Sequence, residues 1–354
     1  MPAGRTGGTA STGGTAVLMV VGPVTGEGHS RPGHPERPAR AVAAMEGVAD
    51  LHLGDELVVV PSRPAERHEL ARVHDGWHLD DLARLSQEGG GSIDGDTYAT
   101  PESWEIATRA AGAGLVAVDG LRAGRADLAL VVARPPGHHA LADRSMGFCL
   151  LNNVAVAAAA LADLGERVLI VDWDVHHGNG TEALFWDDPR VLYVSTHQWP
   201  CYPGTGRAGD VGGEPALGAT LNVPLPPGAT GDVVRRAFDR LVSPAVETFG
   251  PTWVLISAGF DAHRADPLAD LALTTGDFAD LARVVAGYAP APGRLVLFLE
   301  GGYDLGALRA SVAATLGALV DGGEPVEASS SGGPGMDQLD QIAVRRGRAL
   351  NGAG

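Results

Sequence analysis

The segment from Val168 to Gly180, VLIVDWDVHHGNG, constrains the fold more than any other part of this sequence. Its first four residues are aliphatic, which is typical of a parallel strand buried on both faces. Side chains alternate along an extended chain, so Asp172, Asp174 and His176 are predicted to point the same way. Two carboxylates and an imidazole at one strand end are typical of half the ligand set of a metal site. The simpler interpretation is a polar strand end with solvated acids.

Strand and helix patterns alternate along most of the chain. Short apolar runs predict eight strands, at about 17–21, 57–60, 128–134, 168–171, 191–197, 220–223, 253–257 and 295–300. Helical patterns cover about 39–48, 75–87, 101–121, 152–164, 180–185, 231–249, 275–287 and 306–320. This order predicts a single α/β domain with a central, mostly parallel sheet flanked by helices.

The two ends of the chain differ in composition from the middle. Residues 1–16 are rich in Gly and Thr and lack the apolar core of a signal peptide, so we expect a disordered lead-in. The domain itself is expected over 17–321. The Ser/Gly/Pro-rich residues 322–354 are expected to form a flexible tail. Within it, 336–346 has a weak helical pattern that could contact another copy in a homo-oligomer (dimer or tetramer), although a frayed end is the simpler interpretation.

Composition narrows the class of partner. The net charge is −17, which argues against a nucleic-acid partner because phosphates require a basic surface. No run of 18 apolar residues occurs, so no membrane span is predicted. The only two cysteines, Cys149 and Cys201, are too few for a disulfide framework and fit a cytoplasmic protein.

Other polar motifs also follow predicted strands, and in open α/β sheets the carboxyl ends of strands form the ligand crevice. A metal that activates water needs about three protein ligands, and Asp261 is the expected third after Asp174 and His176. Two carboxylates and one imidazole suit zinc, but also iron or manganese. Asp261 could instead cap a turn.

The loop RPPGHHA carries two adjacent histidines, His138 and His139, which could also be ordinary surface residues. Hydrolysis of an amide requires proton transfer, and a histidine near an activated water can perform it. Asp172 and Asn179 are candidates to orient the two imidazoles. Tyr303, after two glycines, is a candidate donor to a developing oxyanion.

Taken together, these motifs resemble those of the histone deacetylase family. The resemblance covers about 17–320 and is closest to bacterial class II histone deacetylase-like amidohydrolases, with acetylpolyamine amidohydrolases and acetoin utilisation proteins as relatives. It rests on HPERPAR (34–40), DTYATPESWEIA (96–107), RPPGHHA (134–140), GFCLLNN (147–153), DWDVHHGNG (172–180), YPGTG (202–206), SAGFDAHRADPL (257–268) and EGGYD (300–304). It implies the arginase/deacetylase fold, with a sheet of about eight strands.

The resemblance also implies roles for individual residues. Zinc would be held by Asp174, His176 and Asp261. His139 would be the general base and acid, and His138 its electrostatic partner. Further catalytic residues would be Asp172 beside His138, Asn179 beside His139, and Tyr303 as the residue that polarises the carbonyl.

The remaining implied residues concern substrate and structure. The acyl-lysine tunnel would be formed by Gly147, Phe148, Tyr202, Leu268 and, at the rim, Asp96. A structural potassium ion would be held by Asp172, Asp174, His176, Ser195 and Thr196. Arg40 would lie near the inner end of the tunnel.

We therefore expect a zinc-dependent amidohydrolase that removes acetyl groups from acyl-lysine peptides or small N-acylated amines. Acetylpolyamines and biosynthetic metabolites remain alternative substrates, although Leu268 stands where polyamine-selective relatives carry an acid. One alternative is an arginase-like dimanganese ureohydrolase, but His263 occupies a position where that chemistry would require a second aspartate. Another alternative is a catalytically silent module that binds acyl groups.

Overall fold

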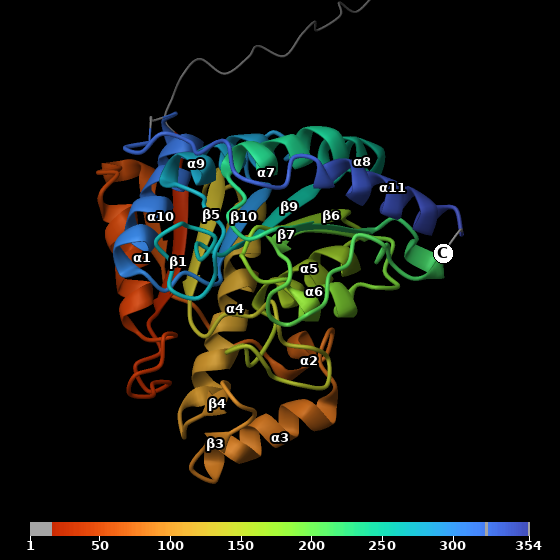
Figure 1. The fold of residues 1–354 in the computed structure, drawn as a ribbon. Coiled ribbons are helices and arrows are strands. Elements are labelled where there is room, and N and C mark those ends of the chain that lie inside the picture. Colours follow the sequence, from red (N-terminus) through yellow and green to blue (C-terminus); the bar gives the residue numbers. More distant parts are fainter. Residues whose placement is uncertain (1–15, 323–324, 353–354) are drawn as a thin grey trace, which may run out of the picture.

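Eight parallel strands form one sheet in the computed structural model, which describes residues 16–322 and 325–352 (Figure 1). The strand order is β2-β1-β5-β10-β9-β6-β7-β8, and each neighbouring pair is parallel. The strands are β1 (Leu18–Val24), β2 (Leu57–Val60), β5 (Leu128–Ala133), β6 (Val168–Asp172), β7 (Val191–Gln198), β8 (Thr220–Leu225), β9 (Trp253–Ala258) and β10 (Leu295–Leu299). All eight predicted strands are present, and the predicted single α/β domain is confirmed. A separate short antiparallel pair consists of β3 (Gly91–Ser92) and β4 (Tyr98–Ala99).

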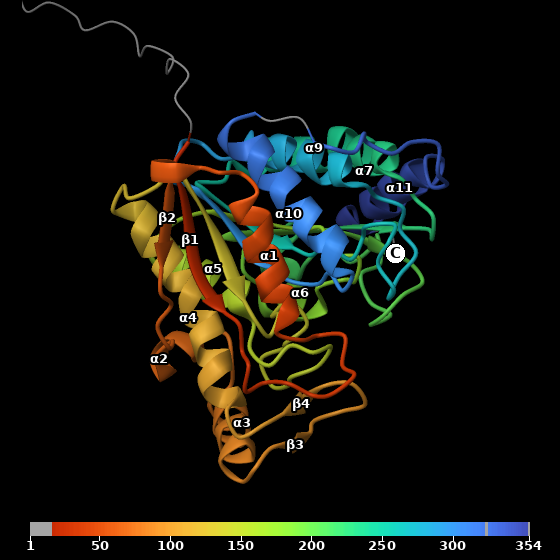
Figure 2. The same ribbon diagram turned by 90° about the vertical axis from the view of Figure 1, so that its left-hand side faces the viewer.

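Helices cover both faces of the sheet (Figures 1 and 2). They are α1 (Ala39–Ala49), α2 (Arg67–Leu70), α3 (Gly76–Gln87), α4 (Ser103–Arg122), α5 (Asn153–Asp163), α6 (Asn179–Leu184), α7 (Gly231–Ala237), α8 (Ser243–Phe249), α9 (Thr275–Ala286), α10 (Leu305–Val320) and α11 (Gln338–Leu350). Helices α4 and α5 pack on one face, and α1, α7, α9 and α10 on the other. The helix predicted over 231–249 is divided by a π-helical turn, Phe238–Val242. Among the described residues, no helix has the length and apolar character needed to cross a membrane.

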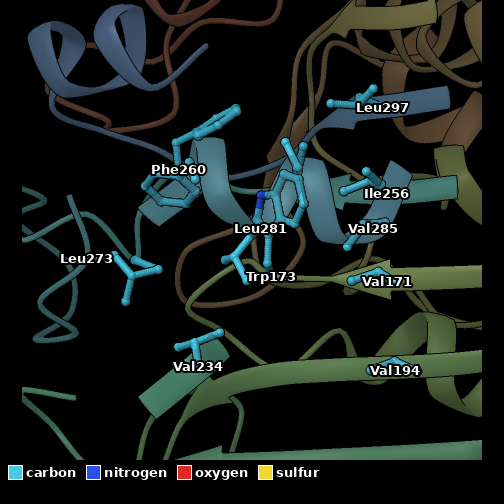
Figure 3. Packing of buried hydrophobic residues seen from close by; sticks show 14 of the residues in the cluster. Val171, Trp173, Val194, Val234, Ile256, Phe260, Leu273, Leu281, Val285 and Leu297 are labelled. Atoms are coloured by element: carbon cyan, nitrogen blue, oxygen red, sulfur yellow. The ribbon is translucent and has the colours of Figure 1, made fainter. Parts of the chain in front are cut away.

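The apolar strands are explained by this two-sided burial. Leu18 and Val20 belong to one core cluster, and Met19 belongs to the other, because successive side chains point to opposite faces. Figure 3 shows the core on the α9 side, to which Trp173 and Phe260 both belong. Trp173 stands between Asp172 and Asp174, so its burial in this core leaves the two acids on the opposite side.

Helix α11, in the C-terminal segment, is packed on the body of the molecule rather than frayed. The weak helical pattern at 336–346 corresponds to the longer helix α11, in which Leu339 and Ile342 are buried. Arg346 of this helix donates hydrogen bonds to the carbonyl oxygens of Thr220 and, at 2.9 Å, Gly218. These contacts cover part of the β8 edge, where backbone groups would otherwise be unpaired. The predicted lead-in, 1–16, lies outside the described residues apart from Ala16.

Candidate active site

Asp174, His176 and Asp261 converge where the neighbouring strands β6 and β9 end. His176 Nδ1 lies 3.1 Å from Asp174 Oδ1 and 3.2 Å from Asp261 Oδ2. Asp261 Oδ1 accepts a hydrogen bond from the Val175 amide, whereas Asp261 Oδ2 is buried and accepts none. A buried acceptor without a donor, close to two other ligand types, fits a site for a divalent cation. Burial and the charge of Asp174 raise the pKa of Asp261 to about 7, which a bound cation would offset.

Two glycines let the backbone approach this cluster closely. The amide of Gly301 donates to Asp174 Oδ2 at 2.8 Å. A Cβ at Gly301 would lie 2.0 Å from Asp261 Oδ2, and one at Gly259 would lie 2.1 Å from Asp174 Oδ2. Any side chain at either position would therefore displace a carboxylate.

The adjacent histidines His138 and His139 follow β5 and have different partners. His138 Nδ1 donates to Asp172 Oδ2 at 3.0 Å, and His139 Nδ1 donates to Asn179 Oδ1 at 2.8 Å. Burial lowers the pKa of His138, but the charges of Asp174 and Asp172 outweigh it and raise that pKa to about 10. Burial and the charge of His138 hold the pKa of His139 well below its usual value. At neutral pH, His138 is a cation and His139 is a neutral imidazole able to accept a proton.

Tyr303 approaches from the loop after β10. Its amide donates to Asp266 Oδ2 at 2.7 Å, and the Arg40 guanidinium carbon lies 4.9 Å from the centre of its ring. Arg40 itself is fully buried and donates through Nε to the Gly302 carbonyl at 2.6 Å. Burial raises the pKa of the Tyr303 phenol well above its usual value, so its hydroxyl remains a hydrogen-bond donor at neutral pH.

A pocket of about 210 Å³ lies above these groups. Its lining consists of Asp96, His139, Gly147, Phe148, His176, Tyr202, Leu268 and Tyr303. All five residues predicted to contact substrate are among them. Gly147 has a φ of 57°, and a Cβ there would lie 2.4 Å from His139 Cδ2. Only glycine therefore lets the backbone of this pocket wall lie in contact with the His139 imidazole.

Of the residues predicted to hold potassium, Asp174 and His176 belong to the metal cluster, Asp172 ends β6, and Ser195 and Thr196 lie on β7. Asp172 is paired in register with Ser195, and both are fully buried together with the nearly buried Thr196. Ser195 Oγ contacts His197 Nδ1 at 2.9 Å, and the Tyr193 hydroxyl donates to Asp172 Oδ2 at 3.1 Å. Binding of a cation by this group stays a prediction.

Sequence reasoning missed Glu300, the last acid before the double glycine. Glu300 is fully buried, and its Oε2 accepts from the amides of Gly137, at 2.7 Å, and His138, at 3.3 Å. Glu300 therefore holds the backbone of the loop that carries His138 and His139 (the histidine loop), and it does so from the end of the neighbouring strand, β10. Its place at a strand end, as the first residue of the motif EGGYD, was the signal that could have identified its role.

A second missed group lies behind the pocket wall. His177 contacts Thr205 Oγ1 through Nδ1 at 2.8 Å and Glu182 Oε2 through Nε2 at 3.2 Å. Glu182 Oε2 also accepts from Asn222 Nδ2 at 2.5 Å. This network ties the loop that carries Tyr202 to α6 and β8, so it supports one wall of the pocket.

His263 does not join the metal cluster. Its Nδ1 accepts from the Ala265 amide at 3.1 Å, and its Nε2 lies 3.5 Å from Glu327 Oε2. The imidazole thus faces the C-terminal segment, so His263 adds no ligand for a second metal beside Asp261.

Comparisons with known proteins agree with this geometry. Residues 34–319 match the model of the histone deacetylase domain. A histone deacetylase-like amidohydrolase from Pseudomonas aeruginosa is 43% identical over 279 residues, covering 77% of this chain and 73% of that protein. Histone deacetylase 10, chloroplastic, from Oryza sativa subsp. japonica is 40% identical over 330 residues, covering 87% and 74%.

A solved structure supports the same assignment. The crystal structure of the HDA15 HD domain matches with a TM-score of 0.87 and 34% sequence identity, covering 96% of this chain and 99% of that one. The arginase/deacetylase fold expected from the motifs is therefore confirmed. The match of a family model to most of the chain, together with these relatives, shows that this protein belongs to the histone deacetylase family and is a hydrolase of the deacetylase type.

Proposed function

We propose that this deacetylase is zinc-dependent and removes acetyl groups from acyl-lysine side chains or small N-acylated amines. One observation carries the proposal: His176 of the three-ligand cluster, the neutral His139 and the phenol of Tyr303 all line the same pocket. A metal ligand, a proton acceptor and an oxyanion donor are the three groups that hydrolysis of an amide requires.

The donor set of Asp174, His176 and Asp261 suits zinc, since two carboxylates and one imidazole leave a further position open. When bound, zinc would lower the pKa of water and polarise the acyl carbonyl. The protein's contribution is to hold both carboxylates in place through the amides of Val175 and Gly301.

Proton transfer is assigned to His139. Its Nδ1 is occupied by Asn179 Oδ1, so Nε2 is the nitrogen free to accept a proton and to return it to the departing amine. The cationic His138 opposes early protonation of His139 and supplies positive charge beside the reacting carbonyl. Asp172 keeps His138 protonated and oriented.

Tyr303 is assigned to the oxyanion. Its phenol lines the pocket, and its ring lies edge-on to Phe148, with centroids 5.9 Å apart. A phenol that stays protonated can donate to the negative oxygen formed during attack on the amide. Phe148 and Tyr202 are assigned to the aliphatic stem of the substrate, and Asp96 to its backbone amide.

The residue at the rim of the pocket indicates which class of substrate the pocket favours. Leu268 is partly exposed there and offers apolar contact, which favours an acyl-lysine over an acetylpolyamine. The potassium site and a cytoplasmic location belong to the same proposal. The acyl-amine substrate is proposed to be a peptide or small molecule rather than a nucleic acid, in keeping with a net charge of −17.

A screen for acetate release tests the proposal. Zinc-loaded protein would be offered acetyl-lysine peptides, acetylpolyamines and N-acetylated metabolites in parallel, with chelator-treated protein as the control. We expect zinc-dependent release, with the fastest turnover on acetyl-lysine. Release of urea from guanidino substrates with two manganese ions per chain, or tight ligand binding without release of acetate, would overturn it.

A further inference from the structure

A second and larger cavity lies beneath the C-terminal half of α11, with a volume of about 780 Å³. Leu192, at the start of β7, and Arg167, directly before β6, are among its lining residues. It therefore opens at the amino ends of these strands, whereas the candidate active site lies at the carboxyl ends. Its size falls within the range of small-molecule sites, and it exceeds the volume of the active-site pocket.

Most of the lining is apolar. The apolar side chains include Leu192, Leu241, Phe249 and Leu350, together with Leu217, of which 54% is exposed. A concave surface with this lining would exclude water from an aliphatic chain placed in it. The apolar part of a ligand therefore has a place to bind.

Arg346 brings a positive charge to this apolar cavity. Its guanidinium donates to the carbonyls of Thr220 and Gly218, but no carboxylate of the described residues lies within ion-pair distance of it. Burial lowers the pKa of Arg346 to about 10, and no neighbouring acid opposes that effect. A guanidinium has five N–H donors, so two carbonyls leave donors for an anion.

Two further arginines line the same cavity. Arg167 donates through Nε to the Gly250 carbonyl at 2.8 Å and, like Arg346, forms no ion pair with a described carboxylate. Arg240 is already paired with Asp340 at 2.5 Å. In a chain with a net charge of −17, two cations without a carboxylate partner at one apolar cavity mark a local preference for anions.

We propose that this cavity binds a medium-length aliphatic carboxylate, with its chain against Leu192, Leu241 and Phe249 and its carboxylate on Arg346. Paired N–H donors of a guanidinium match the two oxygens of a carboxylate, and the contact is strengthened where water is excluded. The apolar lining selects an aliphatic body rather than a free inorganic anion. This site is independent of the assigned deacetylase chemistry.

Isothermal titration calorimetry with decanoate tests the site in the full-length, zinc-loaded protein. We expect one saturable site, with decanol binding about tenfold more weakly because it lacks the charge. Gly347→Leu is the decisive variant. Gly347 lines the cavity, and a Cβ there meets no heavy atom within 4 Å, so leucine would fill the cavity without displacing the helix. It should weaken decanoate binding by about tenfold or more.

A pair of charge variants isolates the arginine. Arg346→Gln should weaken decanoate by about tenfold and decanol little, because glutamine keeps donors but not the charge. The matched control is Arg348→Gln, since Arg348 is exposed on the same helix and does not line the cavity. This control should bind decanoate like the unaltered protein.

Three outcomes overturn the proposal. Binding that survives Gly347→Leu but disappears on removal of zinc places the carboxylate in the catalytic pocket. Equal binding of decanoate and decanol removes the role of Arg346. Absence of decanoate binding, with concentration-dependent dimerisation that Gly347→Leu abolishes in sedimentation experiments, makes this surface a contact between copies of the chain.

Discussion

Asp172 Oδ2 accepts a hydrogen bond from His138 Nδ1 at 3.0 Å, and no carboxylate holds the neighbouring His139 in the same way. This difference divides two residues that are adjacent in sequence into a cation and a neutral base. The pKa of His138 is raised to about 10, while that of His139 is lowered well below its usual value. The assignment of base and electrostatic partner follows from this asymmetry.

His139→Ala should lower turnover on a fluorogenic acetyl-lysine peptide by about a hundredfold or more, because the proton acceptor is removed. The control is His68→Ala, since His68 is exposed and far along the chain from the pocket. Steady-state rates at pH 8 provide the measurement. A near-normal rate in the His139 variant would show that another group moves the proton.

Asn179→Asp should shift the acid limb of the kcat/KM profile to higher pH. A carboxylate beside Nδ1 would raise the pKa of His139, so the base would become protonated, and inactive, at a higher pH than in the unaltered protein. Asn179→Ala is the companion variant, because it removes orientation without adding charge. An unchanged acid limb in the aspartate variant would exclude His139 as the group that titrates.

Tyr303→Phe should also lower turnover by about a hundredfold, since one donor to the oxyanion is lost. The substitution keeps the ring that lies 5.9 Å from Phe148 and 4.9 Å from Arg40, so packing should be preserved. Measuring kcat and KM separately is informative, because the loss should appear mainly in kcat. A loss confined to KM would assign the phenol to substrate binding instead.

Metal removal should abolish activity and lower the melting temperature together. Asp174 and Asp261 are fully buried and repel each other without a cation between them. At free zinc of about a hundred times its dissociation constant, binding would stabilise the folded state by ~2.7 kcal/mol. Asp261→Asn should bind less zinc by elemental analysis, whereas Asp239→Asn, at an exposed position, should retain it. Full activity after complete chelation would contradict the proposal.

His74→Gln should reduce the sensitivity of the fold to acid. His74 Nδ1 contacts the Leu141 carbonyl, and its Nε2 accepts from the Asn152 amide, so the folded protein holds this ring neutral. Burial lowers the pKa of His74 to about 4, against about 6.5 when unfolded. The unfolded chain therefore binds more protons between these values, and the free energy of unfolding falls as pH drops from about 6.5 to 4.

The loss attributable to His74 is up to about 3 kcal/mol. Glutamine can make both hydrogen bonds without titrating, so urea midpoints of the variant should fall less steeply than those of the unaltered protein over this range. Parallel slopes would assign the acid sensitivity to other groups.

Much of the fold could be predicted because the strands are buried on both faces. The run at 168–171 is continuously aliphatic, and it forms most of β6, an interior strand of the sheet. The pocket residues were accessible for the same reason, since motifs after strands must meet at one edge of a parallel sheet. Which of them perform chemistry stays a prediction until the variants are measured.

Other contacts could not be predicted, because they join residues far apart in the chain. Glu300 holds the amide of Gly137, 163 positions away, and nothing in the local pattern at either residue indicates the partner. Helix α11 was underestimated for a similar reason. Most residues of this helix are polar or small. Leu339 and Ile342 become core residues only because the helix packs on the β8 side of the sheet.

The place of β10 has a consequence for the order in which the protein can be completed. Among the described residues β10 is the last strand in sequence, yet it lies between β5 and β9 in the middle of the sheet. Until it inserts, the first three strands and the remaining four are separate half-sheets, and the histidine loop lacks Glu300. A growing chain emerging from the ribosome should therefore stay inactive until residues beyond Tyr303 are available. Activity is expected to appear only after β10 has been synthesised and has entered the sheet.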